Sequence, residues 1–119
     1  MKKVDTIAAW LLVLMGLMHA GATTVAFPRV SLNAIWFLGT GLAILLAAAL
    51  NLLRIHYAAL VPALGRLAAM TNCVLLLLDL AVALQVPLRR NPQILVLFVL
   101  LGFLTVTSLR RPYAAAPAR

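Results

Sequence analysis

The chain has 119 residues, of which 66% are hydrophobic and only 10% are charged. A soluble globular domain is nearer half apolar and a quarter charged, so this composition excludes that class and indicates an integral membrane protein. Ten lysines and arginines against two acids give a net charge of +8, but the basic residues flank apolar runs, so we expect contacts with the lipid bilayer and not with nucleic acid.

Four apolar runs are candidate transmembrane helices. A helix rises about 1.5 Å per residue and needs about 20 residues to cross the hydrocarbon. The first three runs have that length, and the fourth reaches it only by borrowing the preceding Pro-Gln pair. The predicted spans are residues 7–27, 32–53, 64–86 and 94–109. We therefore predict an all-α, polytopic membrane protein, a four-transmembrane-helix bundle with short loops that forms a single domain over residues 1–119.

The first run, residues 7–27, has features of a cleavable signal peptide, because two lysines precede it and an Ala-Gly-Ala sequence lies near its end. The apolar stretch nevertheless continues to Phe27, which is longer than the apolar core of a signal peptide. We expect it to remain as a membrane span, with His19 and Thr23 on one face. Gly16 on the same face is expected where a neighbouring helix approaches closely.

In the second run, residues 32–53, Asn33 and Thr40 lie seven residues apart on one face, with Trp36 beside them. Stripes of small and polar residues let helix backbones approach and let polar side chains find partners on other helices. We therefore expect residues 39–41, Gly-Thr-Gly, to form a close-packing notch, with Gly39 where a neighbouring helix approaches closely. Trp36 is expected to anchor the helix in the interface, with a ring lining the mouth of a cavity as the alternative.

The third run, residues 64–86, carries Asp79, the only acid in any predicted span, on a face shared with Asn72. Cys73 is the single cysteine, which excludes thiol chemistry that needs a cysteine pair. We expect it to be buried. In the fourth run, Ser108 falls at a depth similar to that of Asn72. These two residues predict a second polar layer, nearer the cytoplasm than Asp79.

His19, Thr40 and Asp79 fall at one depth if successive spans are antiparallel, about 11–12 Å below the outer surface of the hydrocarbon. A lone carboxylate in hydrocarbon costs several kcal/mol, and no Lys or Arg lies at that depth. We therefore predict that His19 is the partner of Asp79, with Thr40 close by. Three interpretations stay open, namely a static hydrogen bond, a protonation switch or ligand contact, and no contact.

Polar residues inside the spans are the candidates for a ligand or proton site. These candidates are His19, Thr40, Asp79, Asn72, Asn33, Trp36 and Thr23. The spans hold no set of three His, Cys, Asp or Glu ligands, no Gly-rich phosphate loop and no recognisable nucleophile–base set. We therefore predict no catalytic residue, no metal site and no cofactor.

Orientation follows from the lysines and arginines in the short loops, which are more numerous on the cytoplasmic side. The N-terminal segment, the second loop and the tail hold seven of them, and the first and third loops hold three. The seven are Lys2, Lys3, Arg54, Arg66, Arg110, Arg111 and Arg119, and the three are Arg29, Arg89 and Arg90. We predict a bacterial inner-membrane protein with cytoplasmic N and C termini and a partly disordered tail over residues 110–119.

The stretch NAIWFLGTGLAILLAAALNLLR, residues 33–54, resembles one in uncharacterised small four-helix bacterial inner-membrane proteins whose preceding helix also bears a histidine. The architecture is similar to that of DoxX-like proteins. The length, spans and bracketing charges are also similar to those of small multidrug-resistance transporters. Those transporters carry a glutamate in the first helix where this chain has His19, which argues against coupled cation export. The resemblances imply a four-helix membrane fold and no particular activity.

Two functions are compatible with these patterns. The first is binding or transport of a small ligand or a proton in an outward-facing intramembrane cleft around His19, Thr40 and Asp79. The second is a non-catalytic assembly or accessory subunit, whose polar stripes pack helices or meet another copy or a partner membrane protein. A membrane enzyme is the least favoured class. A cavity that reaches His19 and Asp79 would favour the first, and a solid bundle with an exposed small-residue groove the second.

Overall fold

The computed structural model describes residues 1–110, in which the chain forms helices and no strand. The elements are α1 (Lys2–Ala26), α2 (Leu32–Tyr57), α3 (Ala63–Ala83), the 3-10 helix η1 (Leu88–Arg90) and α4 (Pro92–Ser108). The all-α prediction is therefore confirmed. The prediction of a disordered tail concerns residues that, after Arg110, lie outside the described part of the chain.

The helix boundaries follow from local chemistry. At the start of α2, Ser31 Oγ accepts a hydrogen bond from the backbone N–H of Ala34 at 3.2 Å, which satisfies one of the free donors at a helix N-terminus. Pro92 opens α4 at a position where the missing N–H costs no hydrogen bond. The fourth helix thus begins with the Pro-Gln pair that we expected to extend its apolar run.

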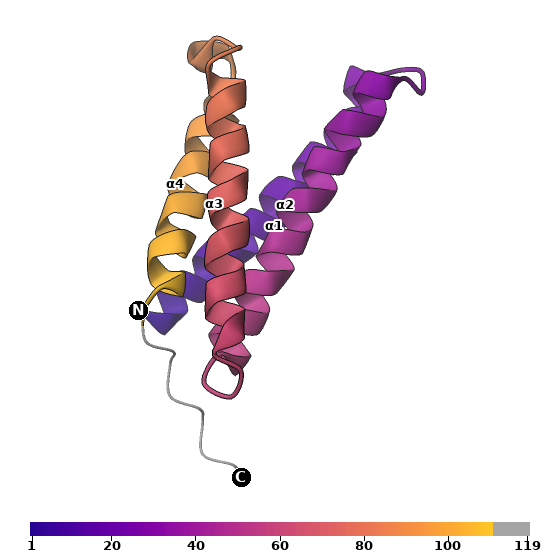
Figure 1. The fold of residues 1–119 in the computed structure, drawn as a ribbon. Helices are drawn as coiled ribbons and strands as arrows, with labels where there is room; N and C mark the ends of the chain where they lie inside the picture. Colours follow the sequence, from indigo (N-terminus) through magenta and orange to yellow (C-terminus); the bar gives the residue numbers. More distant parts are fainter. Residues whose placement is uncertain (111–119) are drawn as a thin grey trace.

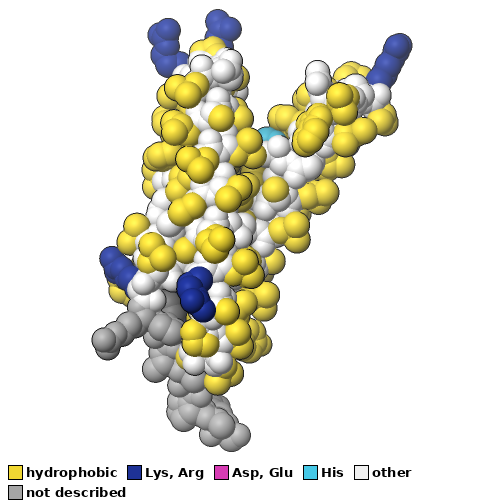
Figure 2. All heavy atoms as spheres, viewed as in Figure 1, with side chains coloured by type: hydrophobic (Ala, Val, Ile, Leu, Met, Phe, Trp, Pro, Cys, Tyr) yellow, Lys and Arg dark blue, Asp and Glu magenta, His cyan; other side chains and the backbone are white. Residues whose placement is uncertain are grey.

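Within residues 1–110, three helices are long and apolar enough to cross a membrane. They are α1 with 25 residues, α2 with 26 and α3 with 21, whereas α4 is apolar but has only 17 residues. In each of the three, only 28% of the most apolar window is buried inside the protein. Many large apolar side chains are therefore exposed, and they cover much of the face shown in Figure 2, as expected of helices that face lipid and not water.

The helices pack as two pairs that diverge at one end of the molecule. α1 lies along α2 and α3 lies along α4, and the pairs meet through contacts of α2 with α3 and of α1 with α4. Figure 1 shows the pairs together where the chain begins and apart where η1 and the α1–α2 loop lie. We call the first the closed end (residue 1, the α2–α3 turn and the end of α4) and the second the open end.

Close backbone approach joins α1 to α2. A Cβ added to Gly41 would lie 2.7 Å from the backbone nitrogen of Ala20, and one added to Gly16 would lie 2.8 Å from Leu45 Cγ. The expectation for Gly16 is confirmed. The expectation for Gly39 is wrong, because nothing lies within 4 Å of a Cβ built there. Within the predicted notch, the close contact is made by Gly41, which lies two residues later and about 200° further around the helix.

Candidate functional site

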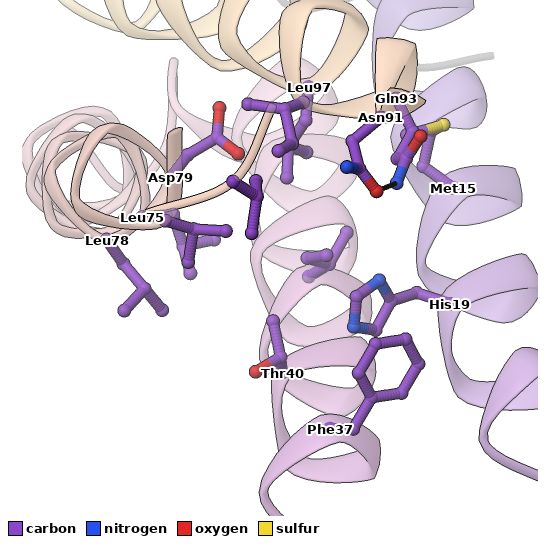
Figure 3. Close-up of a pocket in the computed structure, with 14 residues that line it drawn as sticks. Met15, His19, Phe37, Thr40, Leu75, Leu78, Asp79, Asn91, Gln93 and Leu97 are labelled. Carbon is purple, nitrogen blue, oxygen red and sulfur yellow. Dashed lines mark hydrogen bonds between the residues drawn. The ribbon is translucent and has the colours of Figure 1, made fainter. Parts of the chain in front are cut away.

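A pocket of about 210 Å³ lies between the two helix pairs, on the side of the open end. His19 of α1, Thr40 of α2 and Asp79 of α3 all line it, as Figure 3 shows. Most of the remaining wall is apolar and comes from all four helices. The antiparallel arrangement thus brings together the three residues that were predicted to share one depth.

His19 contributes an imidazole that is held against an aromatic ring. The ring stacks on Phe37 of α2, with centroids 4.1 Å apart and planes inclined by 17°. Its Nε2 atom is buried and has no hydrogen-bond partner among the described residues. A nitrogen in this situation can still accept a hydrogen bond from a guest molecule, or donate one if it carries the proton.

Asp79 enters the pocket from α3 and is only 6% exposed. Its Oδ2 atom is buried and also lacks a hydrogen-bond partner in the described part of the chain. The predicted hydrogen bond with His19 is not formed, because the helix pairs diverge at this depth and the pocket lies between the two side chains (Figure 3). The two groups share a site without contacting each other.

Thr40 hydrogen-bonds within its own helix. Its Oγ1 donates to the carbonyl oxygen of Trp36 at 3.1 Å, which leaves the hydroxyl oxygen able to accept. Asn33 and Trp36 are exposed, Trp36 by 70%, and they lie outside the pocket in a surface groove that also reaches Thr40. Thr23 is buried beside the α1–α2 loop, away from the pocket, and its Oγ1 has no partner in the described residues.

Asn72 does not reach the pocket but joins a polar cluster near the closed end. Its amide exchanges two hydrogen bonds with that of Asn51 on α2, at 2.8 and 3.2 Å, and both residues are fully buried. Ser108 Oγ lies 3.5 Å from Asn51 Oδ1. The predicted polar layer thus exists, and it connects α2, α3 and α4 instead of facing a ligand. Cys73, which we expected to be buried, is exposed.

A buried ion pair lies at the closed end and was not predicted from the sequence. Arg54 Nη2 of α2 lies 2.7 Å from Asp5 Oδ1 of α1, and Thr107 Oγ1 of α4 donates to the same oxygen at 2.9 Å. Both charged residues lie outside the predicted spans, whereas both lie inside the helices of the structure. The available signal was their equal distance from the α1–α2 loop, which an antiparallel pair places at one level.

An apolar layer separates the pocket from these polar clusters. Leu12, Ile44, Leu101 and Leu104 are fully buried and lie, along their helices, between the pocket and the closed end. Packing of this kind excludes water, so the pocket has a dry floor. This layer closes the pocket toward the closed end of the molecule.

The pocket offers one carboxylate, one imidazole, one hydroxyl and the side-chain amides of Asn91 and Gln93, and this set lacks a third His, Cys, Asp or Glu ligand for a metal ion. Within residues 1–110, no group of three or more His, Cys, Asp or Glu could hold a metal ion. Comparison of the chain with family models, with curated proteins and with solved structures gives no match.

Proposed function

We propose that the protein binds a small ligand or a proton in the pocket between its two helix pairs, as a binding or transport protein of the membrane. One observation carries the proposal: His19 Nε2 and Asp79 Oδ2 are buried in the same apolar pocket, and neither has a hydrogen-bond partner within residues 1–110. An unsatisfied buried polar group costs about 1–3 kcal/mol, and more if it is charged. Such a cost in hydrocarbon is typical of functional groups that meet a ligand, a proton or water.

The membrane arrangement that we propose has four spans. The 17 residues of α4 cover about 25 Å, close to the lower limit for a spanning helix, and α4 packs along the longer α3. Four spans place both termini on one side, and the excess of basic residues assigns that side to the cytoplasm of a bacterial inner membrane. The cleft then opens outward.

This orientation predicts the behaviour of reporter fusions. A reporter enzyme that is active only in the periplasm should be inactive when fused after Arg119 and active when inserted at Val30, in the α1–α2 loop. Activity assays on cells expressing the two fusions at equal levels test the prediction. Activity of the Arg119 fusion would mean either an odd number of spans or the opposite orientation, and the Val30 insertion distinguishes the two.

The alternative function is that of an assembly subunit, in which polar stripes serve partner binding. The contacts of Asn72, Arg54 and Thr107 count against it, because these side chains bond within the chain and leave less polar surface for a partner. A partner membrane protein or a second copy would instead have to pack on apolar surface. Loss of function on blocking the pocket would separate the two proposals.

Access of water to the pocket can be measured with a single cysteine. Cys73 is the only cysteine, so Cys73→Ser gives a clean background. In that background, Thr40→Cys should react with a membrane-impermeant thiol reagent added outside at least about tenfold faster than Leu101→Cys, because only a hydrated thiol ionises and reacts. Leu101 belongs to the dry floor and is the matched control. Equal rates for the two cysteines would refute the proposed cleft.

A further inference from the structure

We propose that the ligand of this pocket is a small amphiphilic amine, bound as its ammonium ion. The proposal deepens the proposed function and rests on it. The ammonium group is placed on the Asp79 carboxylate, and the apolar body is placed against the rings and aliphatic side chains of the wall.

The first argument is the charge of the pocket. Asp79 is buried, and no lysine or arginine is among the residues that line the pocket with it. A carboxylate removed from water is stabilised best by an opposite charge that also donates a hydrogen bond. Because no such group among the described residues is bonded to Asp79 Oδ2, a ligand that brings its own cation gains the most from binding there.

The second argument is the pair of acceptors. An ammonium ion has several N–H donors, and one of them satisfies Asp79 Oδ2 while another can reach a second acceptor. The hydroxyl oxygen of Thr40 is an acceptor on another wall of the same pocket, and His19 Nε2 is one in the tautomer that carries its proton on Nδ1.

The third argument is size and polarity. Apart from the polar groups, the wall is built of aliphatic side chains such as Met15, Leu75 and Leu97. The volume of about 210 Å³ is below that of pockets for drug-sized ligands, which begin at about 300 Å³. The ligand is therefore a small molecule whose body is largely apolar.

An anionic ligand is disfavoured even though arginines lie near the open end. Arg29, Arg89 and Arg90 are exposed and belong to the segments that connect the helices. Figure 2 shows basic side chains projecting from both helix pairs at the open end. Arginines at such positions meet lipid headgroups and solvent. An anion inside the pocket would face Asp79, and its repulsion by this carboxylate would not be offset by a cation on the wall.

The test uses three probes with one body and different charge, benzylammonium, benzyl alcohol and benzoate. Their dissociation constants are measured by calorimetry on the full chain in lipid nanodiscs, with empty nanodiscs as the blank for partition into lipid. Benzylammonium should bind most tightly and benzoate most weakly. Asp79→Asn should weaken benzylammonium about ten- to a hundredfold, the loss of a hydrogen bond to a charged group, and should leave benzyl alcohol unchanged.

Equal affinity for benzylammonium and benzyl alcohol, or tightest binding of benzoate, would overturn the amine proposal and leave the pocket a ligand site. Absence of benzylammonium binding would overturn it too, and the labelling rate of Thr40→Cys then reports whether the pocket itself is wrong. The charge series on the wild-type chain decides the question even if Asp79→Asn does not fold. Leu95→Ala, an exposed position on α4 outside the pocket, should bind all three probes as the wild type does.

Discussion

Replacing Asp5 with leucine should destabilise the folded chain by about 3–5 kcal/mol, the cost of leaving a buried charge without its partner. Arg54 is 5% exposed, and its Nη2 lies 2.7 Å from the Asp5 carboxylate. Its Nε atom already lacks a partner in the described residues. Without the carboxylate, Thr107 would be a neutral contact for a guanidinium held between helices. The loss is measured as a lower unfolding midpoint in detergent.

Two further variants make this prediction specific. Lys3→Leu removes an exposed charge from the same helix turn and should change stability by no more than about 0.5 kcal/mol. The double variant Asp5→Leu/Arg54→Met replaces the whole ion pair by apolar side chains and should recover most of the loss. A double variant less stable than Asp5→Leu would show that the arginine is needed for a contact other than the ion pair.

The closed end explains how the open end can stay apart. Within residues 1–110, the side-chain hydrogen bonds that join different helices lie at the closed end, where they connect all four helices. The helix pairs are thus held together on one side of the apolar layer only. On the other side, the pocket separates His19 from Asp79, although both were predicted to pair.

Helix geometry predicted that three polar residues of different helices would share one site, and all three line the same pocket. His19 and Thr40 lie at equal distances from the α1–α2 loop, and a constant rise per residue then sets them side by side in antiparallel helices. Asp79 lies only four residues before the end of α3 at Ala83, because this helix ends three residues earlier than the predicted span 64–86. It nevertheless lines the same pocket.

The angle between the helix pairs could not be predicted from the sequence, because periodicity identifies the polar face of a helix but not the element that packs on it. This is why a His19–Asp79 hydrogen bond was predicted where the structure has a pocket. The Asp5–Arg54 pair was missed for a different reason. Apolar runs mark the hydrocarbon and stop at charged residues, whereas the helices continue through them once each charge is neutralised by the other.

The rotation of a helix about its own axis could not be predicted from the sequence either, as the glycines of α2 show. Gly39 and Gly41 flank Thr40, and each has a leucine as its other neighbour in the sequence. Only Gly41 faces α1. The rotation is fixed by the contact with Ala20 on the other helix, which is a tertiary property. A stripe of small residues therefore predicts that close packing occurs, but not which residue makes it.

Replacing Gly41 with leucine should destabilise the chain by about 3 kcal/mol or more, at the upper end of the cost of overpacking. A Cβ at this position would lie 2.7 Å from the Ala20 nitrogen and 2.9 Å from its Cα. These are backbone atoms, which cannot rotate away, so α1 and α2 would have to separate over several turns. Even Gly41→Ala should lower the unfolding midpoint measurably, because its single added carbon is the one that meets the backbone.

Gly39→Leu is the matched control, since it makes the same change two residues away in the same helix. Nothing lies within 4 Å of the added Cβ, so the leucine should extend into open space and change stability by about 0.5 kcal/mol or less. Thermal unfolding of the two variants in one detergent measures the difference directly. Equal midpoints would show that α2 is rotated otherwise, and Thr40 would then no longer face the pocket. The pair of variants therefore tests the packing and, through the residue between them, the position of the site.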